Sequence, residues 1–356
     1  MTQNDEDIGR VSVAHRALII SGIVALVAIL VLLMWAAVEV LLLIFGGILL
    51  AVALRGLSDL LSKYTRISGG WSLALVVLAL VALFGLGGWF LGDRIASQMN
   101  ELVQSLRESG QQLQLRLQQS EMGQQVLALS SDQPLASGRS PWLGRIAGIF
   151  STTLGIVAYI VVIVFTGLYL AFNPNLYRRG LLLLVPHRAR NRAGGVLNAL
   201  GGALRGWLIG QMFSMVVVGI ATTLGLWLLG IPLALTLGTI AFLLTFIPYL
   251  GPIISSVPAI LVALTIGPME AVYVGLLYLG VQSVEGYLLT PLVQQHYVNL
   301  PPALTIAAQM LAGVLVGPLG IVFATPLAAC GLVVVQMLYV KDVLGDDVRQ
   351  KKQEET

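Results

Sequence analysis

Five long apolar runs, almost free of charged residues, constrain what this chain can fold into. They cover residues 17–37, 38–54, 71–92, 146–172 and 207–229. Each is close to the roughly 20 residues that an α-helix needs to cross the hydrocarbon core of a bilayer. Charged residues make up only 10% of the chain, whereas a soluble domain needs roughly a quarter to cover its surface. The sequence therefore predicts an all-α, polytopic membrane helix bundle.

The composition also argues against several classes of site. The sequence pI is about 9.1, but the basic residues lie in short segments between apolar runs instead of forming the single patch of a nucleic-acid-binding surface. Cys330 is the only cysteine, so the chain cannot form an internal disulfide or a multi-thiolate metal site. His15, His187 and His296 are scattered in polar connections. We expect no metal, no cofactor and no nucleic-acid partner.

Short basic segments predict which helix ends face the cytoplasm. The N-terminal segment and the connection at 55–70 are basic, and residues 173–206 contain six arginines and no acidic residue. The apolar region 17–54 is far longer than the core of a signal peptide, so we expect two spans there. The expected layout is a cytoplasmic N-terminus at 1–16, spans 1–3 at 17–92, an external helical insertion at 93–145, span 4 at 146–172, a basic cytoplasmic segment at 173–206, a transport core at 207–340 and a cytoplasmic tail at 341–356. This layout predicts a multi-pass protein of a bacterial inner membrane with both termini in the cytoplasm.

The external insertion begins with a helical pattern. Ile95, Met99, Leu102, Leu106 and Leu113 follow near-heptad spacing, which is typical of a helix with one apolar face. Two interpretations remain open at this point: the helix lies against its own transmembrane bundle, or it associates several chains.

The basic segment contains two stretches, 176–184 and 196–208, that combine apolar and cationic residues. This pattern predicts surface helices that rest on an anionic leaflet, with arginine side chains reaching the lipid headgroups. The alternative is that the arginines only orient the chain in the membrane.

The second half of the chain contains an internal repeat. Residues 231–237 (IPLALTL) are echoed by residues 300–306 (LPPALTI), and the same offset of 69 places Leu250-Gly251 on Leu319-Gly320. In each copy a Gly/Pro sequence, at 248–252 and at 317–320, separates two short apolar stretches. Proline removes a backbone donor and disfavours helix in the residue before it, so both stretches must be interrupted.

Interrupted helices have a restricted place in a membrane. Irregular backbone survives at membrane depth only where protein buries it or where it lines a water-filled cavity. Paired, short, broken segments in corresponding positions indicate the binding site of a transporter. One span at 270–289 separates hairpins at 231–267 and 300–340, and a single crossing inverts them. We therefore predict six full spans and two inverted re-entrant hairpins whose tips meet near the midplane.

Polar residues near these breaks are candidates for a solute path. The only acids between 146 and 340 are Glu270 and Glu285. Glu270 lies in the first turn of a helix, where capping explains it. Glu285 shares a helix face with Tyr278 and Gln282, and an intramembrane carboxylate is a functional candidate by default; an interfacial cap is the alternative. The full set of path candidates is Glu285, Gln282, Tyr278, Pro248, Tyr249, Gly251, Pro252, Ser255, Gln309, Gly317, Pro318, Gly320, Arg205 and Gln211.

Several stretches carry a family resemblance. The sequences PYLGPI at 248–253, EGY at 285–287, TPLV at 290–293, LPPAL at 300–304 and WLIGQ at 207–211 resemble signature stretches of the autoinducer-2 exporter family. Asn173 departs from that pattern, because relatives often carry an acid after the fourth span.

The resemblance implies an oligomeric inner-membrane permease, and the family is named for export of the furanosyl borate diester signal autoinducer-2 or its precursor. Some relatives are assigned cation/proton antiport. We expect a transporter for a small polar solute that works by alternating access; a sodium (cation)/proton antiporter is the first alternative, and a channel or membrane scaffold is the second. No zinc-ligand spacing, glycine-framed serine or phosphate-binding loop indicates an enzyme.

Overall fold

The computed structural model describes residues 37–65, 67–68, 70–83, 97–98, 100–105, 153–289 and 300–345, together with a few single residues. Within these residues every regular element is a helix. The fold class predicted from the apolar runs is therefore confirmed for the described part of the chain. The first predicted span and most of the external insertion lie outside it.

The first half contains three helices that cross closely. They are Ala37–Thr65, Gly70–Leu83 and α5 (Thr153–Phe172). At the crossing with α5 a Cβ added to Gly47 would lie 2.7 Å from Thr166 Cβ, and one added to Gly167 would lie 2.8 Å from Leu50 Cδ2. Helix Ala37–Thr65 also continues through much of the expected basic connection at 55–70, so the link to the next helix is shorter than expected.

The basic segment folds into two unequal parts. Helix α6 (Pro174–Leu183) is bent by 88° from α5. A short 3₁₀ turn, η2 (His187–Ala189), leads into α7 (Arg190–Leu228), which has 39 residues. The prediction of a second surface helix at 196–208 was wrong, because this stretch is the first half of α7. No proline occurs between residues 187 and 231, so nothing stops the helix, and its apolar residues find partners in neighbouring helices.

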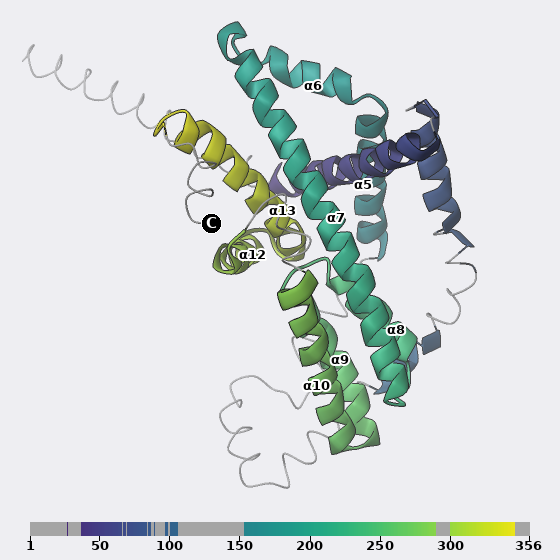
Figure 1. Ribbon diagram of the computed structural model, residues 1–356. Coiled ribbons are helices and arrows are strands. Elements are labelled where there is room, and N and C mark those ends of the chain that lie inside the picture. Colours follow the sequence, from purple (N-terminus) through teal and green to yellow (C-terminus); the bar gives the residue numbers. More distant parts are fainter. Residues whose placement is uncertain are drawn as a thin grey trace, which may run out of the picture.

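The repeat region forms two pairs of helices. The first pair is α8 (Ala234–Leu244) and α9 (Leu250–Ile266); the second is α12 (Pro302–Val316) and α13 (Pro318–Val334). Between them lie α10 (Pro268–Val284) and a π-helical turn, η3 (Glu285–Leu289), and a second π-helical segment, η4 (Val335–Lys341), follows α13. Helix α7 packs against α8, α10 and α13, and α9 packs against α10 (Figure 1). Both breaks thus occur at the predicted Gly/Pro sequences.

Three helices of the described residues are long and apolar enough to cross a membrane: Ala37–Thr65, His187–Leu228 and Pro318–Lys341. The bent pair of α5 and α6 counts as a fourth. The arms of the second repeat unit are unequal, because α12 has 15 residues and α13 with η4 has 24. Six full spans and the re-entrant character of the pairs stay predictions.

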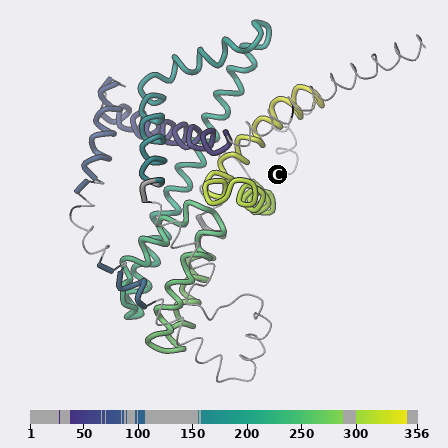
Figure 2. The backbone as a smooth tube through the Cα atoms, turned by 180° about the vertical axis from the view of Figure 1, so that it is seen from behind, coloured from purple at the N-terminus to yellow at the C-terminus, as the bar shows by residue number. Residues whose placement is uncertain are grey.

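A buried cluster joins the described part of the predicted external insertion to the helices of the second half. Leu102 is 3% exposed and packs in one cluster with Leu226, Leu237, Val262 and Val274. Thr236 Oγ1 also donates a hydrogen bond to the side chain of Gln98. Figure 2 shows this short segment beside the ends of α7 and α8. The described part of the insertion thus lies against its own bundle, the first of the two interpretations; Ile95, Met99, Leu106 and Leu113 lie outside the described residues.

Candidate functional site

The first helix break contains a tight and strained turn. Helix α8 ends at Leu244 and α9 begins at Leu250. Between them Tyr249 has φ 64° and ψ −52°, and the Leu250 N–H donates to the Pro248 carbonyl at 2.8 Å. These values describe the rare γ-turn with positive φ, which is strained for a residue other than glycine. Such backbone costs about 1–3 kcal/mol and is concentrated at functional sites.

The second break is a single residue. Gly317 separates α12 from α13 and has φ 81° and ψ −152°. This conformation is accessible to glycine and strained for any residue with a Cβ. Pro318 then occupies the first position of α13, where its missing N–H needs no helical partner.

Two glycines at matching positions of the repeat allow both breaks to close. A Cβ on Gly251 would collide with the carbonyl oxygen of Leu244, and one on Gly320 would collide with that of Ala312. In each pair the first turn of the second helix therefore presses against the main chain of the first helix. Gly251 and Gly320 are separated by the repeat offset, so the sequence repeat corresponds to a repeated backbone contact.

Gln309 connects the two helix pairs. It lies on α12, is fully buried, and donates from Nε2 to the Pro248 carbonyl at 2.9 Å and to Thr325 Oγ1 at 3.3 Å. Because a carbonyl only accepts hydrogen bonds, the amide nitrogen must face Pro248. The amide oxygen of Gln309 then has no hydrogen-bond partner among the described residues. A buried acceptor of this kind is costly unless a water or a ligand supplies a donor.

Further polar side chains reach the first break from α7 and α10. Gln211 on α7 donates to the Thr245 carbonyl at the end of α8. Tyr278 on α10 donates its hydroxyl proton to the Ser255 carbonyl at 3.2 Å. Ser255 Oγ in turn donates to the Pro252 carbonyl at 3.0 Å. Main-chain groups around this break are therefore satisfied by side chains from separate helices, which hydrocarbon could not do.

Glu285 lies where α10 changes into the π-helical turn η3. It is 9% exposed, and the phenol of Tyr249 lies within electrostatic range of its carboxylate. Gln282 is half-buried on the preceding turn. Short π-helical segments occur frequently at functional sites, because they redirect one side chain without ending the helix. Glu285, one of the two acids between residues 146 and 340, thus lies within electrostatic range of the strained residue of the first break.

The described residues bring the predicted path candidates together, with Arg205 as the one exception. Nine surround the first break: Gln211, Pro248, Tyr249, Gly251, Pro252, Ser255, Tyr278, Glu285 and Gln309, with Gln282 beside Glu285. Gly317, Pro318 and Gly320 form the second break, which meets the first through an apolar cluster that contains Phe246, Trp207 and Leu319. Arg205 lies elsewhere, because it pairs with Asp59 at 2.9 Å and donates to the Gly56 carbonyl.

Two residues of the site, Thr325 and Thr245, were not predicted from the sequence. Thr325 accepts the second hydrogen bond of Gln309, and the Thr245 carbonyl accepts from Gln211. A helical threonine in an apolar segment usually bonds its own helix, so no pattern in the sequence distinguishes these two from the other threonines.

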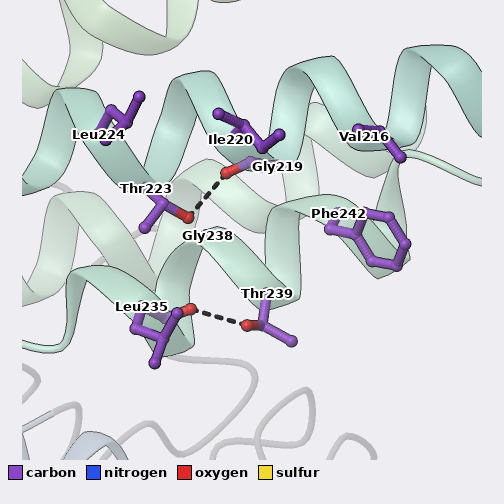
Figure 3. Close-up of a pocket in the computed structure, with 9 residues that line it drawn as sticks. All are labelled: Val216, Gly219, Ile220, Thr223, Leu224, Leu235, Gly238, Thr239 and Phe242. Carbon is purple, nitrogen blue, oxygen red and sulfur yellow. Dashed lines mark hydrogen bonds between the residues drawn. The ribbon is translucent and has the colours of Figure 1, made fainter. Parts of the chain in front are cut away.

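A shallow groove between α7 and α8 is a poorer candidate. Its volume is about 350 Å³, and Val216, Ile220, Leu235 and Phe242 line it. Figure 3 shows that its two threonine hydroxyls bond the carbonyls of Gly219 and Leu235 within their own helices. Neither threonine hydroxyl therefore has a free proton to donate to a polar solute. No cluster of three His, Cys, Asp or Glu residues that could hold a metal ion occurs in the part of the chain that the structure describes.

Comparison with known proteins identifies relatives along most of the chain. Three curated proteins share the description "Putative transport protein": YrrI and YueF of Bacillus subtilis (strain 168) and YhhT of Escherichia coli (strain K12). YrrI is 27% identical over 56% of this chain and 57% of its own length. YueF and YhhT are each 26% identical, over 72% and 71% of this chain and 73% and 72% of their own lengths. Residues 23–339 match the sequence model of the AI-2E family transporters. The chain therefore belongs to this family of membrane transporters.

Proposed function

We propose that this protein carries a small polar solute across the inner membrane, through a path that opens where the two helix pairs meet. The hydrogen bond from Gln309 of α12 to the Pro248 carbonyl carries this proposal. A side chain of one pair thereby holds the irregular backbone of the other. A path between two such pairs has backbone groups available to a solute, and it can open toward either side when the pairs move apart.

Alternating access follows from this arrangement. Each break is closed by a contact between a glycine and the backbone of the preceding helix. We expect such a close contact to be either formed or broken, so that each helix pair has one closed and one open conformation without stable intermediates. Exchange of the Gln309 hydrogen bond for one to the solute would release the first break. The binding energy of the solute would thus favour the open state.

The chemistry of the site suits a solute that has hydroxyl groups. The amide oxygen of Gln309 accepts hydrogen bonds, and Glu285 adds one carboxylate. Autoinducer-2, whose export gives the family its name, is the first candidate by resemblance. We also expect a homo-oligomer on the same ground, and chemical cross-linking in native membranes would count its subunits.

A cation/proton antiporter is the second candidate. Glu285 favours it, because a buried carboxylate can bind a proton and a cation in turn. Purified protein in vesicles would then change the internal pH when sodium is added outside. Ion conductance without solute coupling would instead favour a channel, and absence of any flux would favour a scaffold.

The experiment that tests the proposal compares metabolites inside and outside cells that contain or lack the protein, followed by uptake of the identified solute in vesicles. Glu285→Gln should abolish transport and leave folding and oligomer size unchanged. Glu270→Gln is the matched control, because Glu270 lies at the start of the same helix, away from the break. Transport at the wild-type rate by Glu285→Gln would refute the role of Glu285, and an unchanged metabolite pattern would refute transport by this chain.

A further inference from the structure

Helix α6 leaves a broad apolar face uncovered. Leu176, Leu183 and Leu184 are 67%, 68% and 83% exposed. At about 100° per residue these three side chains lie on one face of the helix, and Arg179 lies at the edge of that face. Leu182, which is less exposed, lies on the opposite side. Contiguous apolar surface of this kind marks a site of interaction.

The orientation of α6 indicates what covers this face. Helix α6 is bent by 88° from α5, and α5 is an apolar helix of 20 residues, the length that a membrane crossing needs. A helix perpendicular to a crossing helix lies along the membrane surface. In that position an apolar face meets acyl chains while cationic residues reach the headgroups.

The arginines near α6 divide into two groups, and the first group is held by the protein. Arg190 donates to the Val185 carbonyl at 3.1 Å and fixes the corner between α6 and α7. Arg192 pairs with Asp342 at 2.7 Å. Arg205 pairs with Asp59, as described above. These three arginines have little capacity left for a ligand.

The second group faces outward. Arg178, Arg179 and Arg188 are exposed and make no hydrogen bond or ion pair with any other residue that the structure describes. No acidic residue occurs in 173–206, and the acidic residues that pair with arginines of this segment within the described part of the chain, Asp342 and Asp59, pair with Arg192 and Arg205 instead. Arg179, at the edge of the apolar face, and Arg188, in the turn after α6, match an anionic amphiphile, which has a phosphate next to acyl chains. Arg178 lies on the opposite side of α6, where its guanidinium is 3.8 Å from the position of a Cβ added to Gly194 of α7.

We propose that α6 and the turn after it bind anionic phospholipids of the cytoplasmic leaflet, with the leucine face among the acyl chains and Arg179 and Arg188 on the phosphates. This inference concerns a lipid partner and does not depend on the identity of the solute. A second copy of the chain fits the same face poorly. A symmetric contact would bring the arginine groups of two copies together.

A lipid titration tests the arginine half of the proposal. The full-length protein in neutral detergent is titrated with phosphatidylglycerol or phosphatidylcholine, and the rise in Tm is recorded. Phosphatidylglycerol should raise Tm and phosphatidylcholine should not. In Arg179→Gln and Arg188→Gln the half-saturating lipid concentration should increase roughly fivefold for each arginine removed.

Two controls keep this titration decisive. Arg192→Gln removes an arginine that is already paired with Asp342, so it should lower the starting Tm and keep the response to phosphatidylglycerol. Inorganic phosphate at the same concentration should give no rise. An equal response to both lipids, an equal rise with phosphate, or a full response in the variant with both Arg179→Gln and Arg188→Gln would overturn the proposal.

A depth measurement tests the apolar half. In a Cys330→Ala background, Leu184→Cys and Arg188→Cys are labelled with a small fluorophore and reconstituted with brominated lipids. Strong quenching at residue 184 and weak quenching at residue 188 would support insertion of the leucine face. Absence of quenching at residue 184, with protection by contacts between copies, would assign this face to an interface between subunits and overturn the lipid proposal.

Discussion

The two helix breaks share one backbone contact and differ in their chemistry. In both, a glycine in the first turn of the second helix, Gly251 or Gly320, lies against a carbonyl of the helix before it. The first break extends over residues 245–249 and draws in polar side chains from α7 and α12. The second consists of Gly317 alone, and its neighbours Val316, Leu319 and Val322 belong to an apolar cluster.

This difference indicates which features both copies of the repeat need and which features can differ between them. The close packing of helix on helix occurs in both copies, because without it neither pair could close. The polar groups are concentrated at one break. We therefore assign solute contact to the first break and a mechanical role to the second, and the following changes test that assignment from the largest expected effect to the smallest.

Substitution of the matched glycines should have the largest effect. Gly251→Ala and Gly320→Ala would each place a methyl group against a backbone carbonyl, and backbone cannot rotate away as a side chain can. We expect each to reduce stability by about 3 kcal/mol or more, seen as loss of monodisperse protein in size-exclusion chromatography of detergent extracts.

Two other helical glycines provide the control. Gly275 of α10 and Gly331 of α13 have open space where a Cβ would be added. Their alanine variants should be as stable as the wild type or more stable, since alanine is the better helix former by about 1 kcal/mol. Normal yields of Gly320→Ala would show that the two breaks do not share this contact.

Gln309→Leu should have the next largest effect. It removes a hydrogen bond to the Pro248 carbonyl inside the protein, which costs about 1–2 kcal/mol. Thermal unfolding should show the loss, and solute uptake should fall to background. Thr305→Val, one turn earlier on the same helix, removes a buried hydroxyl that bonds only its own helix and should keep both properties. If Gln309→Leu takes up the solute at the wild-type rate, the hydrogen bond from Gln309 to Pro248 is not part of the solute path.

The sequence predicted the breaks but not the contacts that complete them. Proline and glycine act on their own backbone, so the positions at Pro248 and Gly317 were predictable from local chemistry. The pairing of Gln309 with Pro248 depends on how two helices 61 residues apart pack, and no local pattern encodes that. The same limit explains the error at 196–208: its cationic residue, Arg205, indicated a surface, but Leu204 and Leu208 are buried against other helices.

Gly317→Ala should have a moderate effect on the second break. Its positive φ is strained for alanine, at a cost of about 1–3 kcal/mol, while no atom blocks the added methyl group. We expect a lower Tm with the transport selectivity unchanged, because the proposed solute contacts lie at the first break. A changed preference among related solutes, measured by competition in vesicles, would contradict the mechanical role.

Tyr249→Gly should have the smallest effect on stability, with the opposite sign. Glycine adopts the positive φ of this turn without strain, so the substitution should recover part of the strain energy of about 1–3 kcal/mol. Glycine also gives the unfolded chain more conformational freedom, which lowers the free energy of unfolding by about 0.5–1 kcal/mol. The net result should be a Tm equal to or slightly above that of the wild type. Transport should nevertheless fall, because the phenol beside Glu285 is lost and the first break is less firmly held. If Tyr249→Gly transports at the wild-type rate with an unchanged Kd for the solute, the strained turn serves packing alone and the two breaks are more alike in function than their chemistry indicates.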